Sequence, residues 1–301
     1  MTILYPHSKL KGMEIVPQLI INSLIAGAIY TILALGFNLI YSTVKFFDLS
    51  YGALTTFGGY AVFYLFRILG LNIFLSIILG VFTAGLTGFL IYKFIYATLR
   101  KRKSSNIVLL VASLGVFTAL QALIAIVFSN QLQTLNPHGS LSKVFEISTG
   151  AITQTQIIII ILSLIAFGLL ALLLKFTMFG KAVKAISDDE EVSKIVGINS
   201  AKVIGVVFFI GAAIAGLSGI LVGFDTGIEP TMGMPLLLKG VIASIVGGVG
   251  NIYGGVAGAF LLGFVENFGI WKISGEWKDA IAFGVLILFL IFRPRGMFSK
   301  E

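Results

Sequence analysis

The 301 residues are 57% hydrophobic and 11% charged, with a mean hydropathy of +1.04. Soluble domains carry roughly 25% charged residues, so this composition excludes an ordinary soluble domain and predicts a polytopic membrane protein. The chain has no cysteine, which excludes a disulfide framework, a thiol nucleophile and Cys-ligated metals, and its two histidines leave little for haem or metal. The net charge of +8 is clustered beside apolar runs, which indicates membrane topology and not nucleic-acid binding.

Eight apolar blocks follow one another, and a bilayer core of about 30 Å needs about 20 residues of helix. The block 236–270 is too long for one helix and contains a glycine cluster at 247–255, so we expect two helices broken there. The first block follows a short polar lead without a small-residue cleavage pattern, which predicts an uncleaved first span. The expected fold is an all-α transmembrane bundle of about eight to ten spans that forms one domain over residues 1–301. The blocks are 17–41, 52–69, 71–92, 107–128, 156–174, 203–224, 236–270 and 280–292.

Charge gives the expected orientation of these blocks. The loop 93–103 is basic and has no acidic residue, which is typical of a cytoplasmic loop. Two spans separate it from the loop 175–202, so parity places both loops on the cytoplasmic side. The basic segment 293–296 lies on the cytoplasmic side as well if the block 236–270 crosses the membrane twice. This model has nine crossings, with the N-terminus outside.

Small residues recur at every fourth position in three of the blocks. Such spacing lets helices pack closely in a bilayer, where no hydrophobic effect brings them together. We therefore expect these ridges to serve helix packing in a compact bundle. They are Gly80, Ala84 and Gly88; Gly211, Ala215, Gly219 and Gly223; and Gly255, Ala259 and Gly263.

Polar residues within or beside the blocks are few, so each one is informative. We expect Glu266 and Arg67 to reach the membrane interface, because long side chains near helix ends extend toward water. For Asp48, lining a conduit and lying at the interface are equally good interpretations. Three amides fit either a polar path or a bridge between two helices: Asn38, Gln121 and Asn251.

The segment 177–199 has the pattern of a short cytoplasmic helix. Ser187 is placed to cap it, the acidic residues that follow suit the first turn, and Gly197 stands where a helix would end. Val192, Ile195 and Val196 fall on one face, so one side of this helix requires a surface to bury against. The membrane surface could cover this apolar face, but a docking site for a cytoplasmic protein fits the pattern better.

This segment resembles the cytoplasmic coupling loop of the permeases of branched-chain amino-acid ABC importers. In that family a basic residue and alanine precede an acid and a Gly-Ile pair, and here these are Lys184-Ala185, Asp189 and Gly197-Ile198. Each further match is weak alone, but together they cover most of the chain in the family's order. The further matches are 27–41, similar to the family's first span; Asp48-Leu49-Ser50-Tyr51-Gly52; the glycine-rich break 239–255; and Arg293-Pro294-Arg295-Gly296-Met297 near the C-terminus.

The resemblance implies a permease subunit with the fold of type II ABC importers, in the inner membrane of a prokaryotic cell. Such a subunit pairs with a second, similar permease or with itself, docks two cytoplasmic ATPase subunits and receives solute from an extracytoplasmic binding protein. It implies that the loop 177–201 carries the ATPase contacts and that this chain binds no cofactor. The implied coupling residues are Gly180, Lys184, Ala185, Asp189, Glu190, Gly197 and Ile198.

The glycine-rich break is the best sequence candidate for the solute path, because irregular backbone is tolerated in a membrane where it lines a cavity. Asp48 and Tyr51 stand where the family typically has Asn and His, so the solute need not be the usual branched-chain amino acid. Relatives in the family also carry urea and other small solutes. The expected path residues are Asn38, Asp48, Tyr51, Gly247, Gly248, Gly250 and Asn251.

Two other classes of protein compete with this interpretation. A secondary transporter driven by an ion gradient would need carboxylates deep in the bundle, and Asp48 and Glu266 are few and near the ends of their blocks. An intramembrane enzyme would need a nucleophile and a base, and no such pair is visible. The chain contains no G-x-x-x-x-G-K-[ST] loop, so we expect ATP hydrolysis on a separate subunit.

Overall fold

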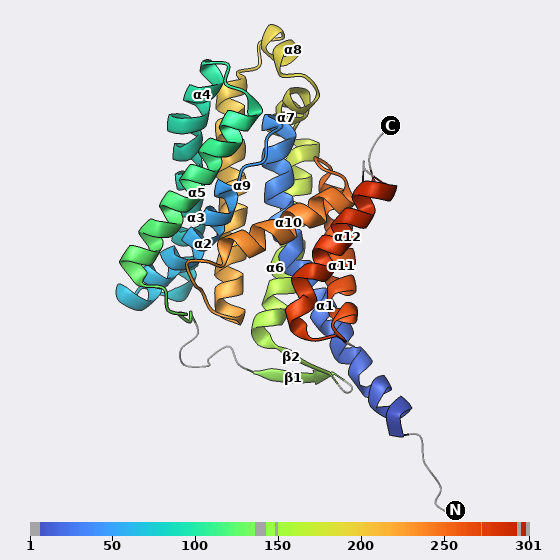
Figure 1. The fold of residues 1–301 in the computed structure, drawn as a ribbon. Coiled ribbons are helices and arrows are strands. Elements are labelled where there is room, and N and C mark those ends of the chain that lie inside the picture. Colours follow the sequence, from blue (N-terminus) through green and yellow to red (C-terminus); the bar gives the residue numbers. More distant parts are fainter. Residues whose placement is uncertain (1–6, 136–142, 148–149, 272, 294–295, 299–301) are drawn as a thin grey trace, which may run out of the picture.

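The computed structural model describes residues 7–135, 143–147, 150–271, 273–293 and 296–298. Pro294 and Arg295 of the C-terminal match lie outside these residues. Figure 1 shows a bundle of roughly aligned helices with a small hairpin at one end. The elements are α1 (His7–Val44), α2 (Ser50–Phe63), the π-helical turn η1 (Tyr64–Ile68), α3 (Ile73–Ile91), the π-helical turn η2 (Tyr92–Tyr96), α4 (Ala97–Lys101), α5 (Asn106–Phe128), β1 (Val144–Ile147), β2 (Gly150–Thr153), α6 (Gln154–Phe176), α7 (Met178–Asp188), α8 (Glu190–Ile195), α9 (Ser200–Asp225), α10 (Gly233–Gly247), α11 (Ile252–Gly269), the 3-10 turn η3 (Gly275–Trp277) and α12 (Lys278–Phe292).

Every apolar block of the sequence forms helix. Within the described ranges, six helices are long and apolar enough to cross a membrane, and α10 is shorter, at 15 residues. At 1.5 Å per residue α10 is about 22 Å long, which is less than the bilayer core. The block 236–270 is broken as predicted, because α10 ends at Gly247 and α11 begins at Ile252.

The two basic loops lie at the same end of the bundle. In Figure 1, α4 of the loop 93–103 and α7 and α8 of the loop 175–202 lie at the top. The last turns of α12 lie toward that end, whereas the β1–β2 hairpin lies at the other. This arrangement has the parity that the charge pattern predicts.

The glycine ridges are packing surfaces, as expected. A Cβ built on Gly219 would overlap the carbonyl of Thr55, so α9 and α2 touch through their backbones. A Cβ on Gly263 would lie 2.7 Å from the carbonyl oxygen of Ser23, so α11 approaches α1 equally closely. Small residues therefore set the distances between the central helices.

The hairpin is an addition to the all-α fold that the sequence predicts. Its strands pair antiparallel, with Val144 opposite Thr153 and Ile147 opposite Gly150. Strands of four residues carry too few alternating positions to be recognised beside the much longer apolar blocks. The hairpin leads directly into α6, where Thr153 and Gln156 form a capping box.

Candidate functional site

A cavity of about 580 Å³ lies where α1, α6 and α7 meet the break between α10 and α11. Its wall includes Asn38 from α1, Lys45 directly after α1, Lys184 from α7 and Gly250 from the break. Small-molecule sites commonly have about 300–1,000 Å³, so a solute of amino-acid size would fit. The cavity joins the predicted coupling loop and the predicted solute path in one space.

The glycine-rich break has a backbone that only glycine adopts easily. Gly248 and Gly250 have φ values of +111° and +86°, a region that side chains disfavour. Asn251 then caps α11, because its Oδ1 accepts hydrogen bonds from the backbone N–H groups of Tyr253, at 3.0 Å, and Gly254, at 3.2 Å. The chain therefore leaves one helix and enters the next within four residues, 248–251.

Asn38 holds the break against α1. Its Oδ1 accepts the backbone N–H of Gly250 at 2.9 Å, and its Nδ2 donates to the carbonyl of Asn251 at 3.5 Å. The side chain is fully buried yet contributes to the cavity wall. The amide bridges α1 and the break, and it also borders the cavity, so its place on a solute path stays a prediction.

The C-terminal segment covers the other side of the break. The N–H groups of Met297 and Phe298 donate to the carbonyls of Val246, at 2.9 Å, and Gly247, at 3.1 Å. The Nδ2 of Asn251 donates to the carbonyl of Phe298 at 2.9 Å. These bonds satisfy carbonyls that the end of α10 leaves open.

Four of the predicted path residues line the cavity: Asn38, Gly248, Gly250 and Asn251. Gly247 packs against Gly254, where a Cβ would overlap the Gly254 carbonyl. Tyr51 is buried in the core and donates its hydroxyl to the carbonyl of Leu33 at 3.0 Å. The structure thus gathers the break and Asn38 at the cavity, and it places Asp48 and Tyr51 elsewhere.

Asp48 lies buried in the link between α1 and α2. Its Oδ1 accepts hydrogen bonds from the Ser50 N–H at 3.0 Å, the Ser50 hydroxyl at 2.6 Å and the Tyr96 hydroxyl at 2.8 Å. Its Oδ2 is buried without a hydrogen-bond partner. Burial raises the pKa of the Asp48 carboxyl above its ordinary value, and the bonds from Ser50 and Tyr96 lower it by less.

The predicted coupling loop forms two short helices, α7 and α8. Thr177 caps α7 by accepting the Gly180 N–H at 3.0 Å, and a Cβ at Gly180 would overlap the backbone of Leu174. Asp189, and not Ser187, caps the second helix: its Oδ1 accepts the N–H groups that begin α8. The prediction of Ser187 was wrong because α7 continues through it to Asp188, and the extended backbone of Asp189 starts a new helix. Gly197 ends this region with a φ of +88°, as predicted.

The apolar face of α8 is not covered by the chain itself. Val192, Ile195 and Val196 are 55%, 84% and 69% exposed. Of the other predicted coupling residues, Lys184 is exposed and Ala185 and Ile198 are half-buried. The helix therefore projects from the bundle with apolar side chains that have no partner within the described residues.

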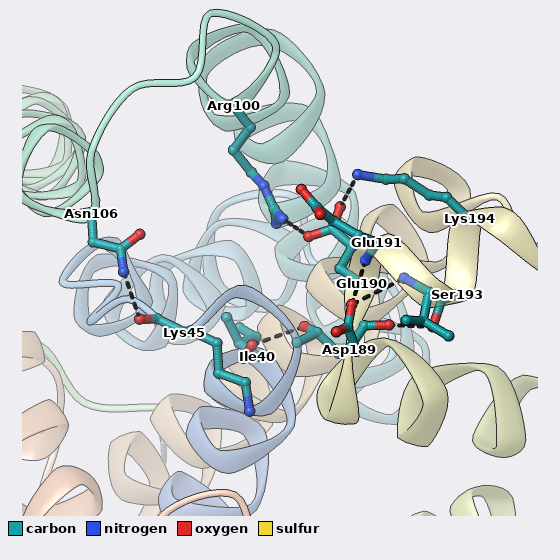
Figure 2. A network of polar contacts seen from close by, with 11 residues as sticks. Ile40, Lys45, Arg100, Asn106, Asp189, Glu190, Glu191, Ser193 and Lys194 are labelled. Carbon is teal, nitrogen blue, oxygen red and sulfur yellow. Dashed lines mark hydrogen bonds and ion pairs between the residues drawn. The ribbon is translucent and has the colours of Figure 1, made fainter.

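The network in Figure 2 joins this loop to α4, a connection that the sequence did not suggest. The Nη2 of Arg100 donates to Oε2 of Glu190, and Lys194 lies 2.9 Å from Oε1 of the same carboxylate. In the same view, the Nδ2 of Asn106 donates to the carbonyl of Lys45 at 3.3 Å, so α5 is tied to the end of α1. The (i, i+4) spacing of Glu190 and Lys194 was visible in the sequence, whereas the position of Arg100 depends on the fold.

Glu266 corrects a second prediction, because it lies inside the bundle and not at the interface. Its side chain has no exposed area, and its Oε1 lies 2.5 Å from the Nζ of Lys239. Its Oε2 accepts the hydroxyl of Tyr30 at 2.6 Å, and Lys239 also pairs with Asp279 at 2.8 Å. Paired charges can be buried where a lone carboxylate would have to reach water. Arg67 is exposed at the end of η1.

The cavity itself is mainly basic at the end that faces α7. Lys45, Lys175 and Lys184 line it, against a single acid, Asp188. Across the described ranges, no three His, Asp or Glu side chains gather closely enough to hold a metal ion. The wall offers positive charge and hydrogen-bonding groups beside apolar side chains such as Leu39 and Val183.

Comparison with known proteins places the chain among transport permeases. Residues 19–290 match the family model of the branched-chain amino acid transport system permease component. The chain is 29% identical to the high-affinity branched-chain amino acid transport system permease protein BraD of Pseudomonas aeruginosa, over 94% of this chain and 95% of that one. It is 27% identical to the corresponding permease protein LivH of Escherichia coli K12, with the same coverage.

A solved structure supports the fold independently. A chain of PsaBC from Streptococcus pneumoniae, determined in complex with a Fab, aligns over 91% of both chains with a TM-score of 0.53 at 14% identity. At that identity the likeness concerns the fold alone. The family match covers most of the sequence, including α1, the predicted coupling loop and the break. The chain therefore belongs to the family of branched-chain amino acid transport system permease components, and it is a multi-pass membrane protein.

Proposed function

We propose that the chain is the permease subunit of an ATP-driven importer for branched-chain amino acids or a related small solute. The observation that carries this proposal is the cavity, whose wall combines Gly180 and Lys184 of the predicted coupling loop with Asn38 and Asn251 at the break. A displacement of α7 would change the shape of a space large enough for the solute. The relatives that share the family act in branched-chain amino acid transport.

The ATPase contacts fall on the end of the bundle that carries α4, α7 and α8. The exposed apolar face of α8 suits a protein partner, and the basic loop 93–103 beside it is typical of the cytoplasmic side. Two ATPase subunits would dock there, one on this chain and one on a second permease or a second copy. Hydrolysis of ATP belongs to those subunits, because this chain has no phosphate-binding loop of the usual type.

Transport then proceeds by alternating access. A binding protein delivers solute at the end that carries the β1–β2 hairpin, and closure of the ATPases moves α7 and α8. The break at 248–251 interrupts the helices where the solute passes, and Gly248, Gly250 and Asn251 form part of the cavity wall. Asn38 keeps the break in register with α1.

The alternative of an ion-gradient transporter is disfavoured by the family match and by the state of the buried acids. Glu266 is paired with Lys239, and Oδ1 of Asp48 accepts hydrogen bonds from Ser50 and Tyr96, so both buried carboxylates take part in contacts between helices.

The test is uptake of radiolabelled leucine into proteoliposomes that hold this chain with its ATPase subunits and binding protein. Uptake that requires ATP, and is abolished when ATP is replaced by a non-hydrolysable analogue, supports the proposal. Uptake driven by a proton or sodium gradient without ATP would replace it with the secondary-transporter alternative.

A further inference from the structure

Polar side-chain contacts attach the short helix α8 to the rest of the bundle at one point. Among the described residues, the ion pair of Arg100 with Glu190 is the only hydrogen bond or ion pair that links α8 to a segment outside 177–225. The other polar contacts of α8 are local, such as the bond from the Ser193 hydroxyl to the Asp189 carbonyl at 2.7 Å. Figure 2 shows the Arg100 side chain reaching from α4 to the first turn of α8.

This pair is more enclosed than an ordinary surface ion pair. The side chains of Arg100 and Glu190 are only 20% and 26% exposed, and Nη1 of Arg100 is buried without a hydrogen-bond partner. The guanidinium has lost much of its hydration, so the Glu190 carboxylate compensates for the cost of burying its charge. A partly desolvated pair of this kind fixes geometry, whereas exposed pairs contribute almost nothing.

Arg100 stands at the end of a long transmembrane element. Ile73–Lys101 runs as one apolar helical stretch of 29 residues through α3, η2 and α4. On α3, Gly85 and Gly88 pack against α9, where built Cβ atoms would lie 2.9 Å and 3.0 Å from the carbonyl oxygens of Phe209 and Phe208. The covalent chain joins α8 to α9, and the ion pair joins α8 to α4. Together with the α3–α9 packing, these two connections link α8, α9, α3 and α4 in a closed loop of contacts.

We propose that Arg100 is a positioning residue for coupling, because its ion pair with Glu190 fixes α8 on the packed α3–α9 unit, so that a displacement of α8 moves this unit as one body. This inference rests on the proposed function, in which an ATPase docks on α8. Without the pair, α8 would be free to tilt on its chain connections, and only part of its displacement would reach α3 and α9. ATP would then be hydrolysed with less solute moved for each molecule consumed.

The test uses Arg100→Gln and Glu190→Gln, singly and together, in the complex of the chain with its ATPase subunits and binding protein. The double variant leaves no buried charge unpaired, so it keeps the test open if a single variant fails to accumulate. Arg100→Lys keeps the charge. Lys101→Gln is the matched control, because it removes an exposed charge one position away on the same helix.

Three quantities are measured for each variant: co-purifying ATPase subunits, ATP hydrolysis, and radiolabelled leucine transported per ATP. We expect the double variant to keep its ATPase subunits and to lose about fivefold or more in leucine per ATP. The single variants should be no better than the double, because the pair acts as one unit. Arg100→Lys should recover most of the ratio, and Lys101→Gln should match the unmodified chain.

The outcomes separate this inference from the proposed function. An unchanged ratio of leucine to ATP in the double variant overturns the role of Arg100. Loss of the ATPase subunits from the double variant alone also overturns it, because the pair would then serve docking and not coupling. Failure of the unmodified chain to bind ATPase subunits would instead refute the proposed function.

Discussion

The Nζ of Lys239 lies 2.5 Å from Oε1 of Glu266, inside the bundle and with no exposed area on the glutamate. This pair joins the short helix α10 to α11, and the Tyr30 hydroxyl and Asp279 extend it to α1 and α12. The break at 248–251 is thus bordered by α10 and α11, whose relative position is fixed by buried charges.

Removing one partner of this pair should destabilise the protein strongly. Glu266→Gln leaves the Lys239 ammonium in the bundle with only Asp279 as a counter-charge, and breaking a buried pair costs about 3–5 kcal/mol. Thermal unfolding in mild detergent should show a clearly lower Tm. Glu276→Gln, an exposed acid nearby, is the control and should leave the Tm unchanged. Equal Tm values for the two variants would contradict a structural role for the cluster.

The sequence could not reveal this cluster, because its members are far apart along the chain. Tyr30 and Glu266 are separated by 236 positions, and Lys239 and Glu266 by 27. Spacing within one helix carries no information about a partner on another helix. A carboxylate near the end of an apolar block therefore predicts a position at the interface, where a lone charge would belong.

A second prediction concerns Asn38. Asn38→Leu removes the acceptor for the Gly250 N–H, and the loss of such a partly buried hydrogen bond costs about 1 kcal/mol. The break should lose its register with α1, so leucine uptake should fall severalfold while the amount of protein in the membrane stays close to normal. Gln121→Leu, a change of similar size on α5, should leave uptake unaffected. Normal uptake by Asn38→Leu would contradict a role for the Asn38 amide in the solute path.

The cap of α8 gives a third prediction. Asp189→Ala removes the acceptor for the N–H groups of Glu191, at 2.8 Å, and Val192, at 3.0 Å, and loss of such a cap costs about 1 kcal/mol. The helix should fray and uptake should decrease, whereas Asp189→Asn keeps the acceptor and should retain most of it. The comparison is made at equal protein abundance. If the alanine and asparagine variants transport equally well, the cap has no part in coupling.

The expected effect of a substitution at Gly180 differs from the effect that the loop pattern suggests. A large residue there would seem to test docking alone, but even a Cβ overlaps the backbone of Leu174. A substitution at Gly180 therefore disturbs the junction of α6 and α7 before it touches any partner. The sequence located this glycine correctly within the loop, and only the fold shows that the space around it is already filled.

The raised pKa of the buried Asp48 carboxyl predicts that the free energy of unfolding depends on pH. Burial raises the pKa of its carboxyl above the ordinary value of 3.8, so the folded chain holds the proton more tightly than the unfolded chain. The resulting stabilisation is complete below pH 3.8 and is lost as the pH rises through the raised pKa of the folded chain. Asp48→Asn mimics the neutral carboxyl and should flatten this dependence in thermal unfolding measured from pH 4 to pH 8. A parallel pH profile for the two proteins would contradict the assignment.

The orientation of the chain can be tested directly because it contains no cysteine. Single replacements Ile195→Cys on α8 and Glu146→Cys on β1 place a thiol at each end of the bundle, at exposed positions. A membrane-impermeant maleimide should label Glu146→Cys in intact cells and Ile195→Cys only in inside-out vesicles. The reverse pattern would invert the proposed topology.

The sequence predicted the helices well and the site in part. Apolar blocks fix the helices because a bilayer demands about 20 such residues, and the glycine cluster fixed the break for the same physical reason. Asn38 and Asn251 were expected near the path and do line the cavity. Asp48 and Tyr51 were expected there and are buried elsewhere, because contacts with Tyr96 and Leu33 depend on packing that no local pattern encodes.

The most direct test of the proposed function is purification of the tagged chain in mild detergent, followed by an ATPase assay on whatever travels with it. We expect an ATPase subunit to co-purify and its activity to rise when a solute-loaded binding protein is added. A chain that purifies without an ATPase and still moves leucine down an ion gradient would contradict the assignment of the α7–α8 loop as the docking site.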